Sequence, residues 1–250
     1  MSLNQNQIYD KFLKDTNLSR LQKILARYEL FKKILETPGD ICECGVFKGS
    51  GIFTWVKLMK LFKPNNNFKV VGFDFFGEKK KKKKFKYKQD KKIQAWHNPG
   101  TISQKEIIDK CNEWGFKNIS LYKGDVRSTT KKYAKENFGS RIALLYLDVD
   151  NYDGSLAILK NLYGKMAKGG IIAFDEYGLK GHGESEAVDE YLNRYEQLFG
   201  QAFTPQNTNI QNQPNKSIQH RTQAEKLVDA IDSQASLEFR TDPMFVNSIQ

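Results

Sequence analysis

Short apolar segments that alternate with helical segments constrain the fold of this chain more than any other feature. Segments with the length and nearly continuous apolar character of buried strands lie at 40–44, 68–73, 118–123, 141–147 and 171–174. Segments with the spacing of helices lie at 52–62, 103–114, 129–137, 154–167 and 184–199. Apolar strands separated by helices are typical of a parallel sheet covered by helices on both faces. The sequence therefore predicts an α/β fold.

The chain of 250 residues is long enough for one α/β domain with an additional segment. Residues 1–38 are expected to form an N-terminal helical segment, with one helix over 8–35 that Pro38 and Gly39 end. The α/β domain is expected at 39–200. Residues 201–250 begin with a stretch rich in Gln, Asn, Pro and Thr, which predicts a polar tail of uncertain order.

Polar side chains mark the start of two of the expected helices. Ser103 and Glu106 have the spacing of a capping box, which predicts that a helix begins there. Asp153 is expected to cap the helix over 154–167. Gly169 and Gly170 are expected to form a turn before the last strand.

The net charge of +11 is concentrated in one part of the chain. Residues 79–92 contain ten lysines and a single acidic residue, a charge of +9, which leaves only +2 for the other residues. The expected loop at 78–100 is therefore a solvated lysine-rich insertion, a lid or docking surface for an anionic substrate, or, least expected, a nucleic-acid contact.

Membrane insertion is not expected from this sequence. The longest apolar runs have the length of strands, and residues 1–20 lack the apolar core of a signal peptide. The three cysteines are odd in number and form no disulfide framework, which is typical of a reducing cytoplasm.

A glycine-rich turn follows the first expected strand and contains candidate cofactor-binding residues. Its spacing of Gly45 and Gly49 is neither that of the dinucleotide-binding turn nor that of a P-loop. Glu43 lies just before the first glycine, where a carboxylate would repel a pyrophosphate but could bind the ammonium group of a methionine moiety. The alternative is a plain tight turn.

Two further acids follow expected strands. Asp74 ends the second strand, where an acid in a nucleotide-binding α/β fold accepts hydrogen bonds from ribose hydroxyls. Asp125 follows the third strand, where it would lie near an adenine. Solvated acids at strand ends are also common, so both positions remain open.

Four carboxylates follow the last two expected strands. Asp148 and Asp150 come after the fourth strand, and Asp175 and Glu176 after the fifth. The carboxyl ends of parallel strands meet at one edge of a sheet, so these groups would repel one another unless protonated or neutralised by a cation. Oxygen ligands without His or Cys favour Mg²⁺, with Ca²⁺ or Mn²⁺ as competitors. Helix capping and solvated turns are the alternative.

With these segments in place, residues 20–200 resemble the macrocin O-methyltransferase family of metal-dependent sugar O-methyltransferases. The matching segments are GDICECGVFKG at 39–49, VGFD at 71–74, KGD at 123–125, LLYLDVD at 144–150 with Tyr152, KGG at 168–170, FDEYG at 174–178 and EAVDE at 186–190.

The resemblance implies a Rossmann-like class I methyltransferase fold, with a mostly parallel sheet, that binds S-adenosylmethionine. It implies that Glu43, Gly45 and Asp74 hold this cofactor, with the serine of the family's turn at Ser50. Gly49 of the same turn and Asp125 complete the expected cofactor-binding residues. The resemblance assigns Asp148, Asp175 and Glu176 as ligands of Mg²⁺ or another divalent cation, and Asp150 as the general base. Glu176 stands where the family usually has an aspartate.

The resulting interpretation is methyl transfer to a hydroxyl of a sugar or nucleotide-linked sugar, with the chain alone or as a homo-oligomer. A metal-dependent methyltransferase acting on a catechol or phenol is one alternative. A non-catalytic protein that binds anionic ligands on the same fold is another, and a nicotinamide-dependent oxidoreductase is a third.

Overall fold

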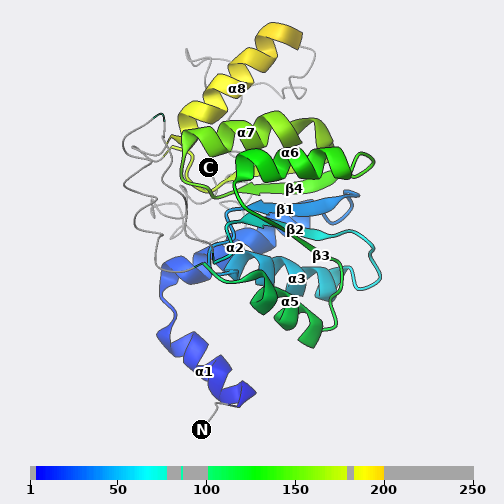
Figure 1. Cartoon of the computed structure of the whole chain (residues 1–250). Coiled ribbons are helices and arrows are strands. Elements are labelled where there is room, and N and C mark those ends of the chain that lie inside the picture. Colours follow the sequence, from blue (N-terminus) through cyan, green and yellow to red (C-terminus); the bar gives the residue numbers. More distant parts are fainter. Residues whose placement is uncertain (1–3, 78–85, 87–100, 179–182, 200–250) are drawn as a thin grey trace.

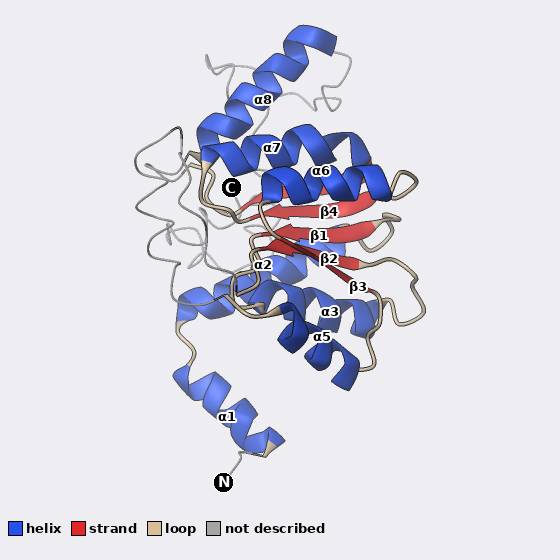
Figure 2. Ribbon diagram, viewed as in Figure 1, coloured by secondary structure: helices blue, strands red, loops and turns tan. Residues whose placement is uncertain are grey.

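The computed structural model describes residues 4–77, 86, 101–178 and 183–199. These residues form a five-stranded sheet with helices on both faces (Figures 1 and 2). The strands are β1 (Asp40–Cys44), β2 (Val70–Asp74), β3 (Ile119–Lys123), β4 (Ile142–Leu147) and β5 (Met166–Phe174). All four neighbouring pairs are parallel, in the order β3-β2-β1-β4-β5. The predicted α/β fold with a parallel sheet is confirmed.

The strand order places a topological switch point between β1 and β4. From β1 the chain builds outward through β2 and β3, and it then crosses to β4 and β5 on the other side. Main-chain hydrogen bonds continue just beyond the strands: Asp148 N donates to Cys44 O at 2.8 Å, and Asp175 N donates to Leu147 O at 2.9 Å. The residues that follow β1, β4 and β5 are therefore held side by side, where ligands of open α/β sheets bind.

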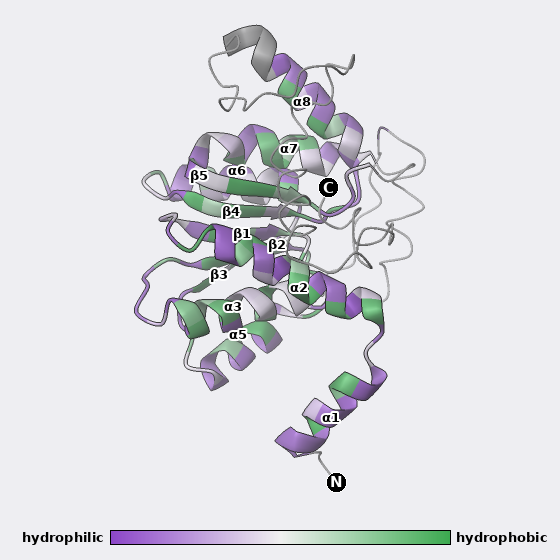
Figure 3. Ribbon diagram, turned by 180° about the vertical axis from the view of Figure 1, so that it is seen from behind, coloured by the Kyte–Doolittle hydropathy of each residue, from purple (hydrophilic) through white to green (hydrophobic). Residues whose placement is uncertain are grey.

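Helices on the two faces bury two separate apolar layers. α2 (Leu18–Lys33), α3 (Ser50–Phe62) and α5 (Gln104–Glu113) cover one face, while α6 (Val126–Glu136) and α7 (Tyr152–Leu162) cover the other (Figure 2). α8 (Glu184–Phe199) packs against α7. Successive residues of β4 contribute to both layers, because Leu144 belongs to the same apolar cluster as Leu30 of α2, and Leu145 to the same cluster as Ile158 of α7. Seen from behind, β4 and the end of β5 are hydrophobic, whereas α2 carries both kinds of residue (Figure 3).

The expected single helix over 8–35 is wrong, because the chain forms two helices there. α1 (Gln5–Asp15) ends at Thr16, and α2 begins after Asn17. The side chain of Asn17 accepts a hydrogen bond from Arg20 N at 3.0 Å, so it caps a new helix instead of continuing the first. No residue of α1 is buried, whereas α2 contributes buried residues to the core.

The expected start of the helix after β4 is also wrong. α7 begins at Tyr152, and its N-cap is Asn151, whose side chain accepts from Gly154 N at 2.8 Å. Asp153 therefore lies inside the first turn. The capping box of Ser103 and Glu106, by contrast, is present at the start of α5 as predicted.

The turn expected at Gly169 and Gly170 lies inside a strand. α7 ends at Leu162, a short 3-10 helix (Tyr163–Lys165) follows, and β5 begins at Met166. The register against β4 shifts between Ile142 and Leu144, so the extra residues of β5 form an irregularity. Glycine suits this place because Gly169 has φ +80° and a side chain on Gly170 would lie 2.9 Å from Ile142 O.

Several expectations concern residues outside the described part of the chain. These are the loop at 78–100, apart from Lys86, and the polar tail at 201–250. Within the described part, the cysteines are free and buried, as the lack of a disulfide framework predicted. No described helix has both the length and the apolar character needed to cross a bilayer.

Substitution of Gly45 by alanine should destabilise the fold. Gly45 has φ +97°, and an added Cβ would lie 1.6 Å from the carbonyl oxygen of Asp148. Because the neighbour is backbone, both the strain and the clash must be absorbed, and we expect a loss of more than about 2 kcal/mol in urea unfolding. Gly164→Ala, where a Cβ meets no atom within 4 Å, is the matched control. Equal stability of the two variants would contradict this account of the turn.

Candidate cation and cofactor site

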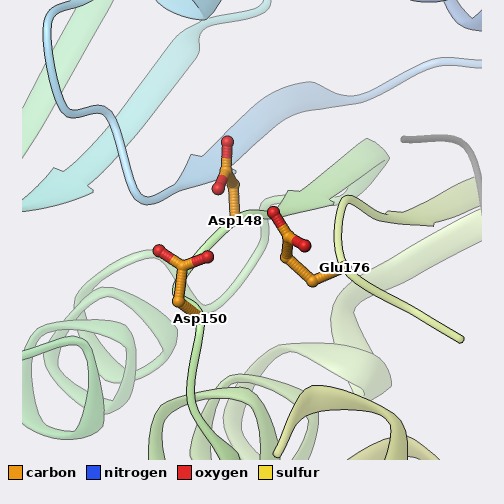
Figure 4. Close-up of side chains that lie close together, drawn as sticks. All are labelled: Asp148, Asp150 and Glu176. Atoms are coloured by element: carbon orange, nitrogen blue, oxygen red, sulfur yellow. The ribbon is translucent and has the colours of Figure 1, made fainter. Parts of the chain in front are cut away.

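Three carboxylates gather at the carboxyl edge of the sheet. Asp148 and Asp150 follow β4, and Glu176 follows β5. One oxygen of each lies within 4.8 Å of an oxygen of the other two. Figure 4 shows the three side chains grouped beside the loops that follow these strands. The structure thus brings together three of the four acids that the sequence predicted to meet.

A strained turn places Asp150 in this group. Its φ of 56° lies in the left-handed region, which is uncommon for a residue other than glycine. The next residue, Asn151, donates to Val149 O through its side-chain amide and accepts from Gly154 N. The cap of α7 therefore fixes the turn, and the turn directs Asp150 back toward Asp148.

Crowding and burial change the acidity of the group. Burial, followed by the charges of Asp175 and Asp150, raises the pKa of Asp148 well above its ordinary value. The same causes raise the pKa of Glu176 to about 8. Without a cation, the group reduces its repulsion by retaining protons. A bound divalent cation would displace those protons and neutralise the carboxylates instead.

The donor set fits a hard divalent cation. All three groups are carboxylates, which Mg²⁺, Ca²⁺ and Mn²⁺ prefer, and no thiol or imidazole belongs to the group. Glu184, at the start of α8, fixes the backbone of one member, because its Oε1 accepts from Glu176 N at 3.0 Å. The side chain of Glu184 is itself fully buried.

Asp175 lies beside this group but is not one of its three members. Its Oδ2 accepts from Lys23 Nζ at 2.7 Å, and its Oδ1 accepts from the hydroxyl of Tyr146. The side chain is only 2% exposed. Both of its oxygens are thus already in contact with donors from the protein.

Glu43 lies beneath the glycine-rich turn. An added Cβ on Gly51 would lie 1.8 Å from Glu43 Oε1, so only glycine lets the first turn of α3 pass over this carboxylate. Glu43 is buried, Oε1 lies 3.7 Å from a guanidinium nitrogen of Arg27, and Oε2 has no hydrogen-bond partner among the described residues. Burial raises the pKa of Glu43 to about 7, although Arg27 acts to lower it.

The other predicted cofactor residues surround this turn. Asp74 Oδ2 accepts from Phe47 N at 2.6 Å, which ties the end of β2 to the turn after β1. Gly49 is the N-cap residue of α3, with φ 83°, and no side chain caps this end of the helix. Ser50, the first residue of α3, is exposed. Asp125 caps α6 by accepting from Arg127 N at 3.0 Å and also forms an ion pair with Arg127.

Sequence reasoning missed the cations that α2 brings to the site. Lys23 binds Asp175, and the buried guanidinium of Arg27 lies 5.1 Å from the ring centroid of Tyr146 and 5.9 Å from that of Trp55. The sequence does contain a sign of these cations. Lys23 and Arg27 share one helical face with Leu30, so they place charge on a face that also carries a core residue.

Comparison with known proteins identifies the family and supports the fold of this chain. A profile of the Macrocin-O-methyltransferase (TylF) family matches residues 16–198. A crystal structure of CalS11, calicheamicin methyltransferase, has a TM-score of 0.61 and 24% identity over 86% of this chain and 84% of that one. An apo structure of CalS11, TDP-rhamnose 3'-O-methyltransferase, has a TM-score of 0.60 and 25% identity over 86% of each chain.

The O-methyltransferase NovP has a TM-score of 0.58 and 21% identity, over 72% of this chain and 73% of that one. No match was found among curated proteins. The likeness to CalS11 confirms the expected α/β fold of methyltransferases.

Replacement of Glu43 by glutamine should flatten the pH dependence of stability. Between pH 4.5 and about 7 the folded chain retains a proton on Glu43 that the unfolded chain has lost, so the unfolding free energy falls as the pH rises. Glu43→Gln removes this contribution, which is about 3 kcal/mol at most. Urea unfolding at pH 5 and pH 7.5 measures the difference. Glu136→Gln, at an exposed position on α6, is the control and should keep the wild-type slope.

Proposed function

Because the chain belongs to the macrocin O-methyltransferase family, we propose that it transfers a methyl group from S-adenosylmethionine to a sugar hydroxyl with the help of a divalent cation. The observation that carries this proposal is the group of Asp148, Asp150 and Glu176 at the switch point of the sheet. A sugar or nucleotide-linked sugar is the proposed acceptor, since the CalS11 structure is that of a TDP-rhamnose methyltransferase at 25% identity.

We assign the methyl donor to the carboxyl end of β1, beside the glycine-rich turn. Glu43 would neutralise its ammonium group, and Asp74 would accept from the ribose hydroxyls through lone pairs not used by backbone amides. Gly45, Gly49 and Ser50 would border the methionine moiety, and Asp125 the adenine. Support comes from the buried carboxylate of Glu43, whose Oε2 lacks a partner among the described residues.

The acids that follow β4 and β5 would prepare the acceptor. A divalent cation, when bound, lowers the pKa of a hydroxyl and orients its oxygen. Asp148 and Glu176 would hold this cation, and Asp150 would accept the proton from the hydroxyl. The oxygen then displaces the sulfur at the methyl carbon, and S-adenosylhomocysteine leaves. Positioning of the two substrates supplies most of the rate enhancement, because a sulfonium is already a good leaving group.

A substrate panel tests the proposed reaction. The protein is incubated with S-adenosylmethionine, Mg²⁺ and either nucleotide-linked sugars or catechols, and S-adenosylhomocysteine and the methylated product are measured by mass spectrometry. We expect methylation of at least one nucleotide-linked sugar that stops when EDTA is added. Methylation of catechols alone would replace the proposed acceptor, and full activity in EDTA would remove the cation from the mechanism.

Asp150→Asn should separate binding from turnover. The amide cannot accept the proton from the acceptor, so kcat should fall by about 10²- to 10⁴-fold. Asp150 belongs to the acid group and not to the glycine-rich turn, so the Kd for S-adenosylhomocysteine, measured by calorimetry, should stay within about twofold of the wild type. Normal turnover of this variant at saturating Mg²⁺ would show that the base is another group.

A further inference from the structure

Helix α2 brings a positive charge to the edge of the acid group. Lys23 Nζ lies 2.7 Å from Asp175 Oδ2, and the two residues are separated by 152 positions in the chain. The lysine side chain is 26% exposed and the aspartate side chain 2% exposed. This ion pair is therefore sheltered from water on the aspartate side, so solvent screens its charges less than those of an ordinary surface pair.

The contacts of Asp175 direct its carboxylate toward protein donors. One oxygen accepts a hydrogen bond from the ammonium of Lys23, and the other accepts one from the hydroxyl of Tyr146 in β4. Asp148, Asp150 and Glu176 instead place an oxygen each within 4.8 Å of one another. Three of the four acids at this edge thus converge, and the fourth, Asp175, has protein donors at both of its oxygens.

The charge of Lys23 also reaches the converging acids. Lys23 Nζ contacts Asp175, which directly precedes Glu176 in the chain. A lysine ammonium carries its positive charge at neutral pH. The second cation that α2 brings to this edge, the buried Arg27, lies beside Glu43 and the ring of Tyr146.

We propose that Lys23 is a positioning residue of the cation site, which binds Asp175 against Tyr146 outside the cation ligands and, through its charge, limits how tightly Asp148 and Glu176, with Asp150 beside them, bind a divalent cation. This inference rests on the proposed function, because it concerns the cation that the function requires. It differs from the ligand set that the family resemblance implies, in which Asp175 binds the cation directly.

The two members of the pair should have opposite effects on cation affinity. Loss of Lys23 leaves Asp175 as an added negative charge near the group and so tightens cation binding. Loss of the Asp175 charge leaves the ammonium of Lys23 without its partner and weakens binding. When both charges are removed together, the net charge of the edge is unchanged, so the affinity should return to that of the wild type.

Mn²⁺ binding, followed by the electron paramagnetic resonance signal of the free ion, tests this inference without any turnover. We expect about tenfold tighter binding for Lys23→Met and about tenfold weaker binding for Asp175→Asn. Lys23→Met/Asp175→Asn should lie within about threefold of the wild type, as should Lys23→Arg, which keeps the charge. Asp148→Asn removes a ligand and should weaken binding by more than about 100-fold. Thermal melts verify that each variant is folded.

Lys32→Met is the matched control. Lys32 lies on the same helix and forms an ion pair with Glu29 at 2.9 Å, away from the acid group, so its loss should leave Mn²⁺ affinity unchanged. A double variant of Lys23 and Asp175 that binds as weakly as Asp148→Asn would overturn the inference, since Asp175 would then be a ligand. Unchanged affinity in Lys23→Met would overturn it as well.

The same experiment distinguishes failure of this inference from failure of the proposed function. If the wild type binds Mn²⁺ and Asp148→Asn does not, the cation site stands whatever the Lys23 variants show. If the wild type binds no Mn²⁺ at millimolar concentration, both the cation of the proposed function and the role of Lys23 are wrong.

Discussion

Repulsion between carboxylates is the constraint on which this sheet edge depends. The hydrogen bonds that align the ends of β1, β4 and β5 bring Asp148, Asp150, Asp175 and Glu176 to one edge, with Glu43 of β1 nearby. Like charges at such distances in a partly dehydrated place interact by several kcal/mol. The fold must therefore supply protons, cationic side chains or a bound cation. The raised pKa values of Asp148 and Glu176, and the contact of Lys23 with Asp175, show the first two of these at work.

The same repulsion gives α2 a role at this edge, because the helix supplies cationic side chains to it. Leu30 and Phe31 of α2 are fully buried against the sheet, and this packing holds Lys23 and Arg27 in place one to two turns earlier. Apolar burial of this size stabilises by about 1.5 to 3 kcal/mol per side chain. This packing offsets the desolvation cost of bringing two charged side chains to a partly buried edge. The family profile likewise begins before α2, at residue 16.

Much of the fold and of the acid group could be predicted because both depend on local signals. Strand length, helical spacing and the acids at strand ends fix β4, β5 and the meeting of Asp148, Asp150 and Glu176. The break at Asn17 was missed because a capping side chain overrode a continuous helical pattern. The extension of β5 through Gly169 depends on its pairing with β4. The bond between Lys23 and Asp175 could not be predicted, since it joins residues far apart in sequence and neither residue type nor spacing specifies it.

The two cations of α2 differ in how they can respond to a ligand. Arg27 is buried, stays charged at any accessible pH and is enclosed by the rings of Trp55 and Tyr146, so its charge beside Glu43 is permanent. Lys23 is partly exposed, and its flexible side chain ends in a compact ammonium. Among the ion pairs of the described residues, this ammonium contacts Asp175. A cation that enters the acid group would therefore repel a charge that can move. This difference follows from residue type: the fixed charge of Arg27 lies beside Glu43, whereas the mobile charge of Lys23 lies beside Asp175, next to the proposed cation site.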